Sequence, residues 1–187
     1  MIKSVLGRSI KELGALLPRI EQLGGELERL GEALLKCWEQ RGKVLIAGNG
    51  GSAADAMHLA EELCVRFAKN RRALAAMALC DATVLTCAAN DFGFEAVFSR
   101  QIEALGNTGD VFVAMSTSGN SANLVRAVDV AKSRGLLTVS LLGKDGGKLR
   151  GKCEIELLVP SPTTARVQEC HKVLYHTLCE WIESKME

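Results

Sequence analysis

The sequence predicts an α/β fold built on a parallel β-sheet that helices cover on both faces. From residue 43 onward, short and nearly unbroken apolar runs alternate with longer segments whose apolar residues recur every three or four positions. Strands buried on both faces of a parallel sheet have this continuous apolar character, whereas strands of half-exposed sheets alternate. At 187 residues, the chain has the length of one such domain.

Two amphipathic helices are expected before the first strand, within residues 2–40. Pro18 and the pair Gly24-Gly25 mark the expected bends. The apolar residues at helical spacing are Ile10, Leu13, Leu16, Leu17, Ile20, Leu23, Leu27, Leu30, Leu34 and Leu35. Such a stripe packs either on the same domain or on a partner subunit, and the sequence leaves both alternatives open.

Five strands are expected in the rest of the chain, each an apolar run that ends at a loop signal. They are residues 43–47, 73–79, 110–115, 137–142 and 154–159. The run 73–79 is short and apolar, which predicts a second buried strand. Helical periodicity fills the intervals between strands, notably at residues 95–105, 122–134 and 163–186.

Composition favours a small-molecule ligand over nucleic acid or a membrane. Charged residues make up 24% of the chain, the net charge is +1, and no dense Lys/Arg cluster occurs. No stretch approaches the roughly 18 continuous apolar residues of a membrane span, and the N-terminus has no apolar signal-peptide core. The seven cysteines form no CxxC pair, as expected for reduced thiols in the cytoplasm.

The stretch from Lys43 to Glu62, KVLIAGNGGSAADAMHLAEE, indicates a strand, a tight loop and a helix. Its glycines let the backbone approach a ligand closely, and the first turn of the following helix presents unpaired N–H groups and a partial positive charge. The loop is therefore expected to bind an anion. His58 and Glu62 follow on one helix face, four residues apart, where they suit a base or metal ligands.

An alternative for the same loop is dinucleotide binding, because Gly48-x-Gly50-x-x-Ala53 satisfies the relaxed fingerprint. That fingerprint expects an acidic residue about 20 positions later, at the end of the second strand. The two glutamates of the helix come too early for this role, and Asp81 comes too late. A Walker phosphate loop is excluded because no Lys-Ser/Thr pair follows the glycines.

A second polar loop, Ser116-Thr-Ser-Gly-Asn-Ser121, lies between the third expected strand and a helix. Three serines and a threonine, together with helix N–H groups, suit a phosphate monoester. The alternative is that one serine only caps the helix, which accounts for Ser121 and not for the other hydroxyls. Both loops follow the carboxyl ends of expected strands, where ligands bind in parallel sheets.

Polar side chains also gather on the last expected helix, at Gln168, Glu169, His171, Lys172 and His176. Spacing favours Gln168 with His171, because residues three apart share a helix face. His176 lies eight residues after Gln168, about 80° round and about 12 Å along an ideal helix. Spacing alone leaves the choice between the two histidines open.

Five segments occur in a distinctive order along the chain: GNGGSAADAMHLAEEL, ANDFGFEAVFSRQIEALG, GDVFVAMSTSGNSANLVRAV, LLGKDGGKL and ARVQECHKVLYH. Together they resemble the phosphoheptose isomerases (sedoheptulose 7-phosphate isomerases) of the sugar isomerase, or SIS, domain superfamily. The resemblance covers nearly the whole chain. It implies a single SIS domain over residues 1–187, a three-layer αβα sandwich with a five-stranded, mainly parallel sheet. Residues 1–41 would form a helical segment used in oligomerisation, and residues 42–187 the core.

The resemblance also implies a set of site residues. The sugar phosphate would contact Asn49, Gly50, Gly51, Glu62, Asn90, Asp91, Ser116, Thr117, Ser118, Ser121 and Gln168. One zinc ion per subunit would be held by His58, Glu62, Gln168 and His176. Glu62 would be the catalytic base and His176 the acid, so the family pattern selects His176 over His171. Ala165 departs from the acidic residue that some relatives carry three positions before the glutamine. Any proton-relay role of that acid is absent here or belongs to another group.

The implied activity is ketose–aldose isomerisation through an enediol. It converts sedoheptulose 7-phosphate to D-glycero-D-manno-heptose 7-phosphate, the first step of ADP-heptose biosynthesis for the lipopolysaccharide core, or of a related heptose biosynthesis. A homotetramer with active sites at subunit contacts is implied as well. The alternative within the superfamily is a non-catalytic protein of the replication-initiator-associating type. Those relatives lack the glutamate of the AMHLAEE motif and the late histidine, and both residues are present here.

Overall fold

The computed structural model describes residues 1–186 and contains a five-stranded sheet in which every pairing is parallel. The strand order is β2-β1-β3-β4-β5. The strands are β1 (Val44–Gly48), β2 (Ala76–Ala78), β3 (Val111–Ser116), β4 (Leu137–Gly143) and β5 (Ile155–Val159). The α/β class predicted from the alternating apolar runs is confirmed.

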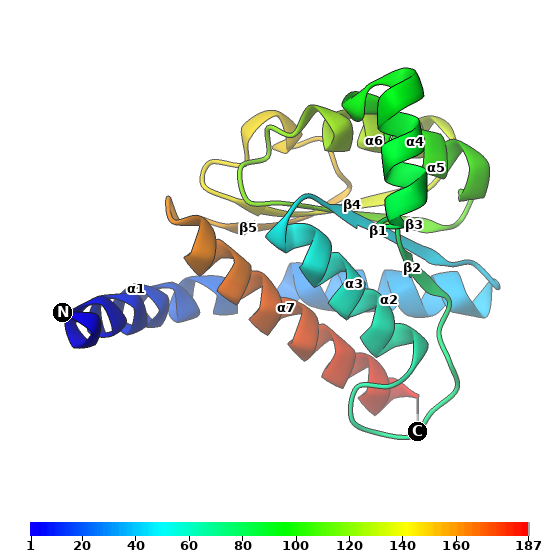
Figure 1. The fold of residues 1–187 in the computed structure, drawn as a ribbon. Coiled ribbons are helices and arrows are strands. Elements are labelled where there is room, and N and C mark those ends of the chain that lie inside the picture. Colours follow the sequence, from blue (N-terminus) through cyan, green and yellow to red (C-terminus); the bar gives the residue numbers. More distant parts are fainter. Residues whose placement is uncertain (187) are drawn as a thin grey trace.

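Helices cover both faces of the sheet and complete a three-layer sandwich. The α-helices are α1 (Ile2–Glu21), α2 (Gly24–Glu39), α3 (Gly51–Cys64), α4 (Ala82–Phe92), α5 (Ser99–Leu105), α6 (Ala122–Ser133) and α7 (Thr164–Lys185). A short 3₁₀ turn, η1 (Phe94–Ala96), lies between α4 and α5, and another, η2 (Gly147–Leu149), lies between β4 and β5. In Figure 1, α2, α3 and α7 lie below the sheet and α4, α5 and α6 above it.

The sheet separates two hydrophobic cores. Along β1, Val44 and Ile46 pack in the core with α2, α3 and α7, while Leu45 and Ala47 pack in the core with α4, α5 and α6. This division follows from the strand geometry, in which successive side chains point to opposite faces. Both faces of the central strands are therefore apolar, which is the pattern seen in the sequence.

Two of the expected elements were wrong in extent. The run 73–79 forms only the three-residue β2, which is not buried, since Met77 is 46% exposed. It is one of the two edge strands, with β1 as its single neighbour. The expected helix 95–105 is divided into η1 and α5.

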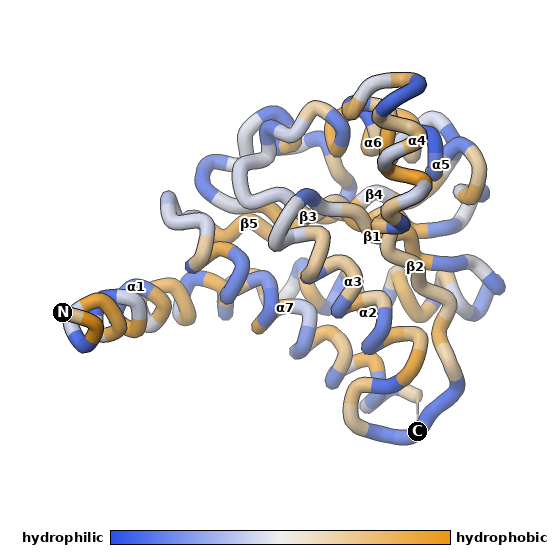
Figure 2. The backbone as a smooth tube through the Cα atoms, in the orientation of Figure 1, coloured by the Kyte–Doolittle hydropathy of each residue, from blue (hydrophilic) through white to orange (hydrophobic). Residues whose placement is uncertain are grey.

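The two N-terminal helices divide the leucine stripe between them. Pro18 lies inside α1 and does not end it, whereas the predicted break near Gly24 is confirmed. α2 packs within the same domain, where Leu27, Leu30 and Leu34 are buried. The outer part of α1 extends away from the rest of the molecule, and Figure 2 shows hydrophobic positions along it.

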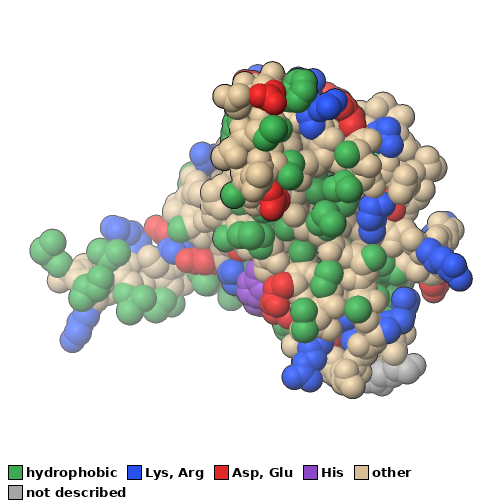
Figure 3. Space-filling view, turned by 45° about the vertical axis from the view of Figure 1, so that its right-hand side comes forward, with side chains coloured by type: hydrophobic (Ala, Val, Ile, Leu, Met, Phe, Trp, Pro, Cys, Tyr) green, Lys and Arg blue, Asp and Glu red, His purple; other side chains and the backbone are tan. Residues whose placement is uncertain are grey.

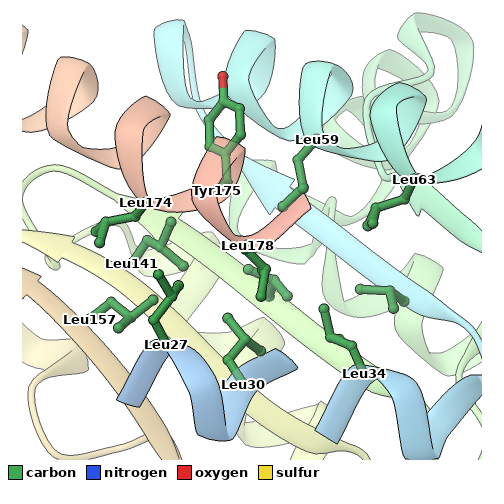
Figure 4. A pocket seen from close by; sticks show the side chains of 12 residues that line it. Leu27, Leu30, Leu34, Leu59, Leu63, Leu141, Leu157, Leu174, Tyr175 and Leu178 are labelled. Atoms are coloured by element: carbon green, nitrogen blue, oxygen red, sulfur yellow. The ribbon is translucent and has the colours of Figure 1, made fainter. Parts of the chain in front are cut away.

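A small apolar void lies between α2, α7 and the sheet (Figure 4). Its volume is about 10 Å³, roughly the space of one water molecule, and leucines form most of its wall. Such a void is a packing feature and has no room for a substrate. The Tyr175 ring lines it, and the Tyr175 hydroxyl points away from the leucines. That hydroxyl reaches the polar cluster described next.

Candidate active site

The two polar loops lie side by side at the carboxyl ends of the central strands. One follows β1 and the other follows β3, and these strands are direct neighbours that run in parallel. β2 lies on one side of β1, and β3 lies on the other side. The chain therefore reverses its direction across the sheet between β1 and β3. This is the topological switch point at which open α/β sheets bind ligands, outside the carboxyl ends of the strands.

A reciprocal pair of amides joins the two loops. Asn49 Nδ2 donates to Asn123 Oδ1 at 3.0 Å, and Asn123 Nδ2 donates to Asn49 Oδ1 at 2.9 Å. Asn123 is buried in the first turn of α6 and also accepts the Leu124 N–H. The role of Asn123 was not predicted from the sequence. The one available signal is that Asn123, a polar residue, stands four positions before the apolar Ala127 and so shares its helix face.

The hydroxyls of the second loop divide into two kinds. Ser116 Oγ accepts the N–H of Gly119 at 3.0 Å, and Ser118 Oγ accepts that of Asn120 at 3.2 Å, so both shape the loop. Ser121 occupies the N-cap position of α6, but its side chain makes no cap hydrogen bond. The interpretation of Ser121 as a simple cap is therefore wrong, and its hydroxyl is available to a ligand.

The second loop is held rigidly by the segment after β4. Gly119 has φ +64°, and a Cβ at this position would lie 1.8 Å from the Gly146 carbonyl oxygen. The Leu149 N–H donates to the Gly119 carbonyl at 3.0 Å, and the Lys148 N–H donates to Asn120 Oδ1 at 3.1 Å. A glycine is required here because any side chain would collide with the neighbouring backbone.

Gln168 contacts the first loop. A Cβ on Gly51 would lie 2.3 Å from Gln168 Nε2, so the absence of a side chain at Gly51 lets α7 pass over the start of α3. α7 is continuous from Thr164 to Lys185, which separates Gln168 and His176 by about 12 Å along its axis. Within one chain, the contact of Gln168 is with the loop.

His58, Glu62 and His176 form one cluster at the surface of the α3–α7 layer. His58 Nε2 lies 3.1 Å from Glu62 Oε1, and the rings of His58 and His176 are 5.1 Å apart between centroids. One potential ligand atom from each of the three residues lies within 4.8 Å of the others. Figure 3 shows histidine at the surface beside acidic and basic side chains. The helical spacing correctly placed His58 and Glu62 on one face.

The surroundings of His176 favour a neutral imidazole. Its Nε2 is buried and has no hydrogen-bond partner in the described part of the chain. Burial, and then the neighbouring His58, lower the pKa of His176 from its ordinary value. A neutral imidazole has one nitrogen that accepts and one that donates, and it can also ligate a metal.

A polar network orients the His58 ring from behind. Tyr175 Oη lies 3.1 Å from His58 Nδ1 and 3.4 Å from Asp55 Oδ1. Lys172 Nζ donates to Tyr175 Oη at 3.0 Å and pairs with Asp55 at 3.1 Å. Such a network fixes the ring and determines which nitrogen carries the proton. Asp55 and Tyr175 were missed from the sequence, although Asp55 lies three residues before His58 on the same helix.

His171 points to the other side of α7. Its side chain is fully buried, and its Nε2 lies 3.0 Å from the Leu142 carbonyl oxygen, so the ring links α7 to the end of β4. Spacing had left the choice of histidine open, and of the two only His176 lies beside His58 and Glu62.

Asn90 and Asp91 form no hydrogen bond with the two loops in the described part of the chain. Both are exposed at the last turn of α4. Asn90 Nδ2 donates to Asp91 Oδ1 at 2.8 Å, and Cys87 Sγ lies 3.6 Å from Asp91 Oδ2. Over residues 1–186, neither side chain makes another hydrogen bond.

Comparison with known proteins identifies the family. Residues 10–143 match the SIS domain family. The chain is 50% identical over 161 residues to the phosphoheptose isomerase of Fusobacterium nucleatum. This alignment covers 86% of this chain and 83% of the Fusobacterium protein. The chain belongs to the phosphoheptose isomerase family. Phosphoheptose isomerase 1 of Campylobacter jejuni is also 50% identical to this chain, over 87% of this chain and 88% of the Campylobacter protein.

Solved structures of this family agree with the fold. The phosphoheptose isomerase of Neisseria gonorrhoeae has a TM-score of 0.93 at 41% identity, covering 98% of this chain and all of its own. The Francisella tularensis phosphoheptose isomerase has a TM-score of 0.85 at 33% identity, covering 98% and 96%. The NanR protein of Vibrio vulnificus, at 19% identity and a TM-score of 0.69, shares the fold alone.

Proposed function

We propose that the protein is a ketose–aldose isomerase that converts sedoheptulose 7-phosphate to D-glycero-D-manno-heptose 7-phosphate. One observation carries the proposal, namely the cluster of His58, Glu62 and His176, whose potential ligand atoms lie within 4.8 Å of one another. Membership of the phosphoheptose isomerase family supports the substrate, because the relatives bear that name. The non-catalytic alternative is not favoured, because such relatives lack the counterparts of Glu62 and His176.

The phosphate end of the substrate would lie between the two loops. Backbone N–H groups at the starts of α3 and α6 point to this region, and Ser121 has a free hydroxyl there. Asn49, Gly50 and Gly51 would contact the substrate on the first loop, Ser116, Thr117, Ser118 and Ser121 on the second, and Gln168 between α7 and the first loop. Glu62 lies about 16 Å from Gly51 along α3, so the cluster that meets the carbonyl end of the sugar would come from a neighbouring subunit.

The chemistry requires two coupled proton movements. Glu62 removes the proton from C1 of the ketose and returns it to C2, while a proton moves from the C1 hydroxyl to the former carbonyl oxygen through His176. The intermediate is an enediol, and no oxidant or reductant is consumed. A neutral imidazole suits the second movement, because a ring nitrogen that does not bind zinc can accept the hydroxyl proton and pass it to the other oxygen.

The cluster also fits a zinc ion. The buried Nε2 of His176 has no protein partner in residues 1–186, and it lies close to His58 and Glu62. Two imidazoles and a carboxylate form a common zinc ligand set. Gln168 lies about 12 Å from His176 along α7, so its amide oxygen would join the set only from a neighbouring subunit. When bound, zinc would polarise the carbonyl and stabilise the enediolate oxygens. The Tyr175 hydroxyl would accept the His58 Nδ1 proton and hold that ring in the ligating tautomer.

We also propose a cytoplasmic homotetramer whose active sites lie at subunit contacts. The exposed apolar positions of α1 support an interface there. Asn90 and Asp91 are exposed and form no hydrogen bond with the two loops in the described residues, which supports their contribution to a neighbouring subunit's site. The seven free thiols agree with a reducing compartment. Among the described helices, none has the length and apolar character needed to span a membrane.

Glu62→Gln is the direct test of the proposed chemistry. The amide keeps the size of the side chain and removes the base, so kcat with sedoheptulose 7-phosphate should fall by about two to four decades. Equilibrium binding of the substrate should persist, because the phosphate loops are unchanged. The wild-type protein should also be assayed with five- and six-carbon ketose phosphates. Faster turnover of a shorter sugar would contradict the assigned substrate, and full activity of Glu62→Gln would contradict the assigned base.

A further inference from the structure

Glu183, near the end of α7, is a buried carboxylate that the proposed chemistry does not use. Its Oε1 accepts the N–H of Phe67 at 2.9 Å, and its Oε2 accepts those of Ala68 and Lys69 at 3.0 and 2.8 Å. Burial raises the pKa of Glu183, but these three bonds and the nearby Arg71 together bring it below its ordinary value. An ionised Glu183 therefore fixes the backbone of the connection between α3 and β2.

Arg71 joins the same carboxylate to the end of α3. Its Nε lies 3.3 Å from Glu183 Oε1, and the two side chains are only 4% and 3% exposed. Nη2 donates to the backbone carbonyl of Glu62 at 2.7 Å, and Nη1 donates to that of Leu63 at 2.9 Å. A cation at a helix C-terminus satisfies carbonyls that have no intrahelical partner. Arg71 thus holds the helical turn from which the Glu62 side chain projects.

Phe67 places the same connection against the other catalytic candidate. Its ring centroid lies 5.5 Å from that of His176, and its N–H is one of the three donors to Glu183. Glu183 comes seven residues after His176, about two helical turns, so both side chains lie on one side of α7. A single carboxylate therefore fixes the segment that touches His176 and, through Arg71, the helix end that carries Glu62.

We propose that Glu183, Arg71 and Phe67 form a positioning clamp that sets the geometry between Glu62 and His176. The two candidates project from different helices, and the clamp joins these helices at the end of α3 away from the phosphate loops. Proton transfer depends steeply on such geometry, since a misplacement of about 1 Å can cost about 100-fold in rate. The kinetic part of the proposal rests on the proposed function, whereas its structural part does not.

Glu183→Gln tests the clamp in the full-length protein. The amide keeps the shape of the side chain but presents an NH₂ group to backbone N–H donors and removes the charge that faces Arg71. The kcat should fall about 10- to 100-fold. The KM should stay within about threefold, because the phosphate loops lie at the opposite end of α3.

Asp110→Asn is the matched control. Asp110 is also buried, accepts the N–H groups of Lys43 and Asn107 at 2.9 and 2.8 Å, and pairs with Lys43 Nζ at 2.6 Å. It lies at the amino end of β3, and its side-chain contacts in the described residues are with Lys43 and Asn107, not with the clamp or the cluster. This variant should lose thermal stability as Glu183→Gln does, and it should keep its kcat within about twofold. If both variants lose kcat in proportion to their stability, Glu183 is merely structural and the proposal is wrong.

Histidine-ring NMR provides a readout that needs no catalysis. The chain has three histidines, so each ring can be followed in the substrate-free protein. Both Glu183→Gln and Phe67→Leu should shift the His176 signals, the latter through the lost aromatic contact. The signals of His171, which is held against Leu142, should not shift.

Phe67→Leu leaves the buried ion pair intact, so this variant provides the test if Glu183→Gln does not fold. Unmoved His176 signals in Phe67→Leu would overturn the clamp. Shifted signals in a protein without isomerase activity would count against the proposed function alone.

Discussion

His171 and His176 lie five residues apart on α7 and have opposite surroundings. Five residues correspond to about 140° around an ideal helix, so one ring faces the sheet while the other faces α3. His171 bonds to the Leu142 carbonyl, and His176 lies beside His58. The sequence offered both as candidates because spacing describes a helix face without saying what covers it.

The two histidines should respond differently to the same substitution. His176→Asn removes the proposed acid and should lower kcat by about two to four decades. His171→Asn should leave kcat within a few-fold of the parent, but it should lower the free energy of unfolding by about 1–3 kcal/mol through the lost buried bond. Steady-state kinetics and urea denaturation of both variants check this. A dead His171→Asn with an active His176→Asn would reverse the assignment.

The buried His171 should also make stability depend on pH. Burial lowers its pKa below the ordinary value of 6.5, so just below that pH the unfolded chain binds a proton that the folded chain does not. The free energy of unfolding should therefore fall as the pH decreases from about 7.5 to about 5.5. Urea denaturation across this range measures the slope. The slope should be smaller in His171→Asn, and an identical slope would mean that other groups cause it.

At the scale of elements, the apolar runs predicted four of the five strands well and the edge strand β2 poorly. β1, β3, β4 and β5 lie within one residue of their expected limits. β1, β3 and β4 have two neighbours each and are apolar along most of their length, whereas β5 is an edge strand like β2. The run 73–79 has the same composition, yet only Ala76–Ala78 pair with β1. Composition cannot distinguish an edge from a centre, since strand order is set by contacts between distant segments.

The candidate site was predictable where it depends on local geometry. The loop glycines, the second-loop hydroxyls and the His58–Glu62 pair all follow from short-range spacing. Asn123, Asp55 and Tyr175 were not found, because their roles depend on partners 74 to 120 positions away along the chain. Such partners become visible only when α6 or α7 is placed against the first loop and α3.

The second loop allows a prediction that separates ligand contact from loop structure. Ser121→Ala should raise KM by about one to two decades, the effect of losing a charge-assisted hydrogen bond of about 1.5–3 kcal/mol. Its melting temperature should hardly change, because the hydroxyl makes no cap bond. Ser118→Ala should raise KM and also lower stability, since it loses the bond to Asn120. Ser133→Ala, at the other end of α6, is the control. An unchanged KM for Ser121→Ala would place the phosphate elsewhere.

At the scale of the whole molecule, the leucine stripe of the N-terminal helices serves two purposes. Leu27, Leu30 and Leu34 of α2 complete the core beneath the sheet. In α1, burial begins only at Leu16, and the preceding turns extend beyond the domain. Deleting residues 1–40 would therefore remove core side chains together with any interface, and an insoluble product would not reveal the assembly. A test of assembly must change the outer turns of α1 alone.

The double substitution Leu6→Glu with Ile10→Glu makes that test. These side chains are 58% and 62% exposed in the single chain, so glutamates there cost the isolated fold little, whereas an apolar interface would have to bury two unpaired charges. Light scattering of the parent should give a mass near four times 20.1 kDa. The double variant should give a smaller assembly with an unchanged circular dichroism spectrum. Lys11→Glu, an exposed charge reversal on the same helix, should leave the mass unaltered.

Because Asn90 and Asp91 would act in a neighbouring subunit's site, the dissociated variant should also lose turnover. A tetramer that persists in the double variant would show that the outer turns of α1 are not the interface.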